Sequence, residues 1–183
     1  MHPLARPRAT AYLLDCIGYL GVAAAMVPVG IVVAATTDLG TSRAYSQLVS
    51  AIPPAIATVI AARAESGPRR ATWGKRRRGL EVVAKGGGTP GFGAALLRNT
   101  AKIFLPWQLG HLTTIGAIWG AFDEGDPLTI GASIGCYALM AAYAWTVLRG
   151  SGRGIHDLLA GTTVVAVRET ARLSAPSTPS RSR

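Results

Sequence analysis

The chain contains four apolar runs, each close to the length of about 20 residues that an α-helix needs to cross the hydrocarbon core of a bilayer. The runs are residues 11–35, 44–62, 106–122 and 128–148. A soluble domain of 183 residues rarely contains several apolar runs of this length. We therefore predict an all-α membrane protein with about four transmembrane helices. Pro53 and Pro54 interrupt the second run and should kink its helix, because proline has no backbone N–H to donate.

The distribution of positive charge predicts how these helices are oriented. The chain has 19 Lys and Arg against 9 Asp and Glu, which gives a net charge of +10. Two of the basic residues precede the first run, ten lie in residues 63–102 and six follow residue 148, which leaves Arg43 for the two other loops. Loops rich in Lys and Arg stay on the cytoplasmic side of a membrane. The pattern thus predicts an even number of spans, both termini in the cytoplasm and a basic cytoplasmic loop over residues 63–105.

The basic loop also shows signs of local structure. The pattern of Ala94–Phe104 predicts an amphipathic helix in the membrane surface, with Arg98 and Lys102 on one face towards lipid phosphates. Leu80–Val83 and Thr162–Val167 are candidate strands, which would pair as a small cytoplasmic two-stranded ribbon.

Two boundaries complete the domain organisation. Pro106 should end the amphipathic helix and begin the third span. Residues 1–168 are predicted to form one transmembrane domain. Residues 169–183 are rich in Ser, Pro and Arg, a composition that predicts a disordered basic tail.

Asp15 is an acid inside the first apolar run. A charge there costs about 2.5–3.5 kcal/mol at the centre of a membrane helix and less near its end, so Asp15 needs a partner, a proton or water. Its carboxylate either binds an ion or proton, or ties helices together; both interpretations stay open. A cleaved signal peptide is the alternative for this run, but the run exceeds the usual apolar core of about 7–15 residues.

Arg8 lies two helical turns before Asp15, on the same face of the predicted helix. The rise between them is about 10 Å, which is too far for a direct salt bridge. We expect Arg8 to meet a lipid phosphate or another acid, and Asp157 is the candidate on the same side of the membrane. Asp157 is also placed to cap a short helix over Ile155–Ala160. We further expect the ribbon to hold Asp157 close to Asp15.

Three ordered blocks of sequence resemble the RDD family of bacterial integral membrane proteins. The blocks read RATAYLLD, ATWGKRRRGLEVV and GRGIHDLLAGTTVV. By motif match, the one Arg and two Asp of the family correspond to Arg8, Asp15 and Asp157, and GGGTPGFGAALLRN adds Arg98. Trp73 stands where the family usually has Pro. The resemblance covers nearly the whole chain and implies a multi-pass protein of the bacterial inner membrane; cation/proton antiport has been proposed for a few members.

The KRRR run of the basic loop consists of Lys75, Arg76, Arg77 and Arg78. We predict that these four side chains face lipid, fix the topology and bind anionic head groups at about 1 kcal/mol per basic residue near the surface. Nucleic acid is not an expected partner, because the run lies between two spans and lacks a pattern of stacking aromatic residues.

The remaining polar candidates give weaker signals. His111, in the third span, reads as an interior histidine bonded to a neighbouring helix rather than as a proton relay. His156 and Asp157 are adjacent, so their side chains point apart on a helix, and no third ligand has metal-site spacing. Cys16 and Cys136 lie in apolar runs and read as packing residues. We expect no metal, no cofactor and no enzymatic activity.

Two functions remain open from the sequence. One is transport of a monovalent cation or proton, with Asp15 as the protonatable group and Arg8, Asp157 and His111 as supporting polar residues. The other is a non-catalytic membrane scaffold or assembly protein, whose basic loop binds anionic lipid or a partner. A second copy of the chain and another membrane protein are the two expected kinds of protein partner.

Overall fold

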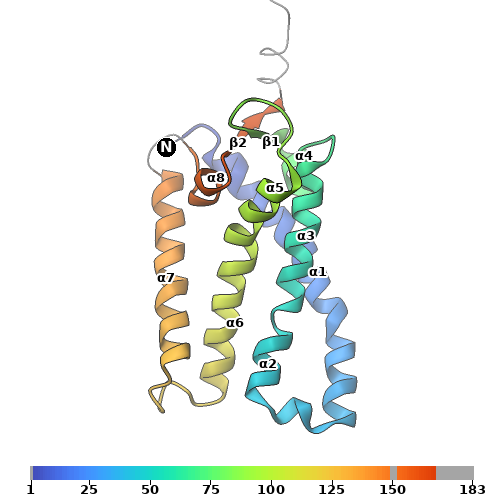
Figure 1. The fold of residues 1–183 in the computed structure, drawn as a ribbon, viewed down its shortest axis with the longest axis vertical. Coiled ribbons are helices and arrows are strands. Elements are labelled where there is room, and N and C mark those ends of the chain that lie inside the picture. The colour runs from blue at the N-terminus through green and yellow to red at the C-terminus, as the bar shows by residue number, and fades with distance from the viewer. Residues whose placement is uncertain (1, 149–151, 168–183) are drawn as a thin grey trace, which may run out of the picture.

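The computed structural model describes residues 2–148 and 152–167, which form long helices side by side with a small cap at one end (Figure 1). The long part consists of α1 (Ala5–Thr36), α2 (Arg43–Val49), α3 (Ile52–Ser66), α6 (Leu105–Ile118) and α7 (Pro127–Leu148). The cap end holds α4 (Trp73–Arg77), β1 (Leu80–Ala84), α5 (Phe92–Asn99), α8 (Ile155–Leu159) and β2 (Thr162–Ala166). Two short helical pieces, η1 (Asp38–Thr41) and the π-helix η2 (Thr100–Phe104), complete the described chain.

Three helical stretches are long and apolar enough to cross a membrane: Ala5–Thr36, Arg43–Ser66 and Pro127–Thr146. Large apolar side chains such as Leu13 and Ile17 on α1 are about two-thirds exposed, which suits a surface that faces lipid rather than water. The predicted all-α membrane fold is therefore confirmed. The expected third span is α6, which has only 14 residues and lies antiparallel beside α7 in the bundle (Figure 1).

The second stretch, Arg43–Ser66, is interrupted at the position expected from Pro53 and Pro54. α2 ends at Val49 and α3 begins at Ile52, with Pro53 in the first turn of α3. Proline fits that turn because the first N–H groups of a helix have no partner inside the helix. The break lets the two halves contact different neighbours, α2 lying against α6 and α3 against α5.

The prediction of a surface helix over Ala94–Phe104 is wrong in two respects: the residues at which the helix begins and ends, and the side to which Arg98 points. α5 continues through the π-helix η2 directly into α6, so the chain is helical from residue 92 to residue 118. The N–H of Leu105 bonds to the carbonyl of Thr100, the wider spacing of a π-helix. Pro106 therefore does not end the helix. Because α5 packs against α3, Arg98 points into the protein instead of towards lipid.

The predicted ribbon is confirmed. β1 and β2 pair antiparallel, with Val82 opposite Val164. These two valines and Leu80 pack with Ala11 in one buried apolar cluster. The cluster joins the ribbon to the first helix and so fixes the cap on the bundle. The expected tail, residues 169–183, lies outside the described residues.

Candidate functional site

Asp15 lies beneath the cap, where the short helix α4 covers it. Its carboxylate accepts a hydrogen bond from the Thr72 hydroxyl at 2.6 Å and another from the Gly74 N–H at 2.7 Å. The side chain is only 5% exposed. Asp15 therefore lies ten residues along α1, at the level of α4, and its two oxygens are bonded to the cap.

Glu65, at the end of α3, is the centre of the site and is fully buried. Its two oxygens lie 2.8 Å from Nη1 of Arg98, and one of them lies 2.6 Å from Nζ of Lys75. The side-chain amide of Asn99 donates a further hydrogen bond at 2.8 Å. Glu65 thus binds α4 and α5 to α3 through charged hydrogen bonds.

Asp157, in the first turn of α8, is also fully buried. One oxygen pairs with Arg8, and the other lies 3.0 Å from Nε of Arg98. The N–H of Gly154 donates to the carboxylate at 2.9 Å, the bond of a helix cap. Arg8 also donates to the Gly152 carbonyl. The predicted Arg8–Asp157 pair and the predicted capping by Asp157 are both confirmed.

These contacts join into one network. Arg98 links Asp157 to Glu65, and Lys75 links Glu65 to Thr72, whose hydroxyl also bonds to Asp15. No direct contact between Asp15 and Asp157 is found among the described residues, so the ribbon brings the two acids into one network and not into contact.

The charges of the network explain why buried acids are tolerated. Burial alone would raise the pKa of Asp157, but the charge of Arg98 and the other cations nearby lower that pKa below its usual range. Burial likewise opposes the charge on Arg98, but Glu65 and Asp157 raise the pKa of its guanidinium. A buried ion pair needs this kind of full hydrogen bonding to offset the loss of water.

The prediction that the KRRR run faces lipid is wrong for Lys75. Its side chain is 4% exposed and inside the network, because Gly74 brings α4 against α1 and Glu65 supplies a counter-charge. The three arginines that follow it, Arg76, Arg77 and Arg78, are exposed, and their contact with lipid stays a prediction.

The two histidines among the predicted candidates, His156 and His111, have different surroundings. His156 is 8% exposed, packs its ring edge-on against Tyr143 and lies 3.6 Å from Asp157. Burial and the nearby charge of Arg98 lower the pKa of His156 well below its usual value, so the ring is neutral. His111 stacks edge-on against Trp107, and its Nδ1 has no hydrogen-bond partner in the described residues. The expected hydrogen bond from that atom to a neighbouring helix is not seen.

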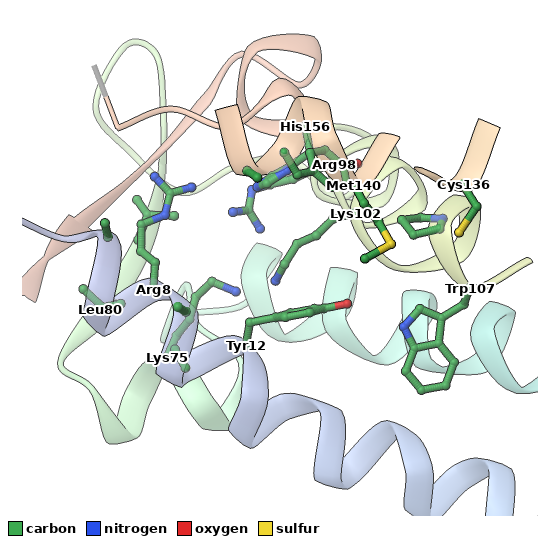
Figure 2. A pocket seen from close by; sticks show the side chains of 17 residues that line it. Arg8, Tyr12, Lys75, Leu80, Arg98, Lys102, Trp107, Cys136, Met140 and His156 are labelled. Atoms are coloured by element: carbon green, nitrogen blue, oxygen red, sulfur yellow. The ribbon is translucent and has the colours of Figure 1, made fainter. Parts of the chain in front are cut away.

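A cavity of about 510 Å³ borders the network between α1, η2, α6 and α7. Figure 2 shows Arg8, Lys75 and Lys102 at one end of it and Trp107, Cys136 and Met140 at the other. The Lys102 ammonium lies 4.7 Å from the ring centroid of Tyr12.

A second, smaller polar cluster lies at the far end of the bundle, where α7 begins. Nη2 of Arg43 lies 2.5 Å from a carboxylate oxygen of Asp126 and 2.9 Å from the Thr129 hydroxyl. The hydroxyl and the N–H of Thr129 both donate to the same oxygen of Asp126. This cluster closes the opposite end of the bundle and contains none of the predicted site residues.

Glu65 is not among the residues predicted from the sequence, although its spacing gives a signal. Thr58, Ala61 and Ala62 precede it at seven, four and three residues, and all four are buried on one side of α3. A charged residue that continues a stripe of small buried residues is expected to be buried and paired. The sequence pattern predicted Lys102 only as a charge on the surface helix.

The chemistry available here is ionic and structural. The oxygens of the buried network carboxylates are held by cations, hydroxyls, an amide side chain or backbone N–H groups. Within residues 2–148 and 152–167, no three His, Cys, Asp or Glu side chains come together as metal ligands.

Comparison with known proteins found one matching family. The model of the RDD family matches residues 2–161, which include Arg8, Asp15, Glu65, Arg98 and Asp157. No curated protein and no solved structure matches the chain.

Proposed function

Since this chain belongs to the RDD family, we propose that it is a multi-pass membrane protein that acts by binding anionic lipid or a membrane partner, and not by moving ions. In this proposal the helices cross the membrane four times, with α6 as the third span along the chain. The cap and both termini lie in the cytoplasm, in keeping with the excess of Lys and Arg there.

The observation that supports a binding function is the bonding of the buried carboxylates. A transport site needs a carboxylate that exchanges its ion or proton with water during each cycle. Asp15 instead accepts from Thr72 and Gly74, and its neighbours Glu65 and Asp157 are held by cations. Breaking such pairs costs about 3–5 kcal/mol each, which suits a permanent clamp.

The surface of the cap supplies the binding element. Arg6, Arg77 and Arg78 border one surface hollow beside Pro7 and Thr10. Three positive charges at one place on the proposed cytoplasmic side would attract anionic head groups, at about 1 kcal/mol each near the surface.

Cation transport is the competing function, and flux through reconstituted vesicles distinguishes the two. We expect no proton movement when Na⁺, K⁺ or Li⁺ is added to proteoliposomes that contain the wild-type chain. Asp15→Asn should lower the melting temperature, because an amide cannot accept from two donors equally well. A cation-dependent flux that disappears in a folded Asp15→Asn variant would replace this proposal with transport.

The lipid part of the proposal has its own test. Replacing Arg76, Arg77 and Arg78 by Gln should reduce the enrichment of phosphatidylglycerol over phosphatidylcholine in the lipid that co-purifies with the protein. The control replaces Arg63, Arg69 and Lys85 by Gln, which removes three exposed charges that do not border the hollow. Unchanged enrichment in the arginine variant would leave a protein partner as the ligand of the cap.

A further inference from the structure

Lys102 is a cation of the site that lacks a carboxylate partner. None of the ion pairs among the described residues includes it, and its ammonium faces the Tyr12 ring. Burial, together with the charges of Lys75 and Arg98, lowers the pKa of Lys102 well below its usual value. An ammonium placed in this way would gain from an anion beside it.

The charges around the cavity leave a place for one anion. Four cations border it: Arg8, Lys75, Arg98 and Lys102. Three buried carboxylates belong to the same network: Asp15, Glu65 and Asp157. Arg8, Lys75 and Arg98 form ion pairs with Asp157 and Glu65, and Asp15 is bonded to Thr72 and Gly74. Among the described residues, Lys102 is the cation of the cavity without an ion pair, and the four cations exceed the three acids by one.

The other end of the cavity is apolar. Trp107, Met140 and Ala144 line it, with Tyr12 between this end and the cations (Figure 2). Ala144 on α7 and Ala9 on α1 both line the cavity and are exposed, so the cavity opens at the side of the bundle. In a membrane protein that side faces lipid chains, and about 510 Å³ is within the usual size of a ligand pocket.

We propose that this cavity binds one anionic phospholipid, with its phosphate beside Lys102 and Arg8 and its acyl chains passing along Trp107 and Met140 into the bilayer. A charged end, an apolar end and a lateral opening match the three parts of such a lipid. Inorganic phosphate would leave the apolar end uncovered. The inference extends the proposed lipid binding from the exposed arginines to an enclosed site, and rests on it.

Native mass spectrometry of the full chain in detergent tests the charged end. We expect one phosphatidylglycerol to bind per chain, more tightly than phosphatidylcholine with the same acyl chains. Lys102→Gln should weaken phosphatidylglycerol binding at least tenfold, the size expected for a lost hydrogen bond to a charged group. Lys85→Gln removes the same charge from an exposed position that does not border the arginine hollow, and should change the affinity less than twofold.

Filling the cavity tests the apolar end. Ala144→Trp keeps every charge and should weaken phosphatidylglycerol binding as strongly as Lys102→Gln. Melting curves show whether each variant is folded. If Lys102→Gln does not fold, Lys102→Arg is measured instead. Lys102→Arg keeps the charge and should still bind phosphatidylglycerol, whereas Ala144→Trp should not.

Several results would overturn the inference. Equal losses in Lys102→Gln and Lys85→Gln would mean diffuse surface attraction. Equal binding of oleate or of inorganic phosphate would mean that the occupant is wrong. If only the exposed-arginine variant loses phospholipid, the proposed function stands and this inference fails. If the wild type does not prefer phosphatidylglycerol at all, both fail.

Discussion

The backbone of Gly74 lies against the backbone of α1, and this approach determines where α4 sits. A Cβ built on Gly74 would lie 2.1 Å from the Ala11 carbonyl oxygen and 2.8 Å from Oδ1 of Asp15. The residue before it, Trp73, occupies the first position of α4, stands 44% exposed and stacks with Arg77. Proline is favoured at such a position, so the exchange of the usual Pro for Trp removes no contact with the network.

Gly74→Ala is expected to destabilise the protein, because the new methyl group separates α4 from α1 and lengthens the Gly74–Asp15 hydrogen bond. Overpacking of this kind costs about 1–3 kcal/mol. Gly86→Ala is the matched control, since a Cβ there meets nothing within 4 Å. Thermal unfolding in detergent measures both. Equal melting temperatures would show that α4 moves away from α1 at little cost.

Asp126 allows a prediction about pH. The hydroxyl and N–H of Thr129, with Arg43, lower the pKa of Asp126 to about 2. A carboxyl with a lowered pKa stabilises the fold above its unfolded pKa of about 3.9, and this contribution is lost as the pH falls towards 2. Asp126→Asn should therefore melt below the wild type at pH 6 and close to it near pH 2.

The exposed neighbour Asp123 provides the control for this pH dependence. Asp123→Asn should follow the wild-type melting temperature across the same range, because its side chain is exposed on the turn. If the gap between wild type and Asp126→Asn were the same at pH 6 and pH 2, the Arg43–Asp126–Thr129 cluster would not be the source of the acid sensitivity.

At the scale of elements, the ribbon and the broken helices determine how the cap meets the bundle. β1 follows α4 directly, and β2 follows α8, so pairing of the two strands brings Asp157 to the side of α1 that carries Arg8. The π-helix η2 adjusts the register between α5 and α6, and it contains Lys102. The continuous helix formed by α5 and η2 thus places Arg98 and Lys102 at the same cavity.

Val164→Ala tests the contact between the ribbon and α1. Val164 is 4% exposed and packs with Leu80 and Ala11, whereas the next residue, Val165, is only partly buried on the other face of the ribbon. Removing two methyl groups from the buried site should cost about 1.6 kcal/mol, at about 0.8 kcal/mol for each carbon. Val165→Ala should cost less in the same melting assay. The reverse order would place the core on the other face.

At the scale of the whole molecule, the cap lies at one end of the long helices and the start of α7 at the other (Figure 1). Large apolar side chains such as Ile17, Ile31 and Ile134 are exposed on the helices. The buried network lies under the cap, and the Arg43–Asp126–Thr129 cluster lies at the far end. A molecule of this form fits a bilayer, with its polar ends in the two aqueous phases.

Cysteine labelling in intact cells tests the proposed orientation. In a chain whose two native cysteines are replaced by Ala, Asp123→Cys should react with a membrane-impermeant maleimide from outside. Gly86→Cys, in the turn after β1, should react only after the membrane is opened. The opposite pattern would place the cap outside the cell and would contradict the count of basic residues.

The sequence alone determined the features that depend on neighbouring residues or on composition. Apolar runs predicted the all-α membrane fold, Pro53 the break between α2 and α3, and two valine-rich segments the ribbon. The family resemblance picked out Arg8, Asp15, Arg98 and Asp157, and all four lie in the network.

The tertiary structure alone decided which charges are buried. Arg98 and Lys75 look like surface cations in the sequence, because an isolated charge belongs in water or among head groups. They are buried because Glu65 and Asp157, distant in the chain, offset the cost of leaving water. Lys102 lies half-buried at the edge of the same network, and none of the ion pairs among the described residues includes it. Partners that come together only when the chain folds cannot be read from local spacing.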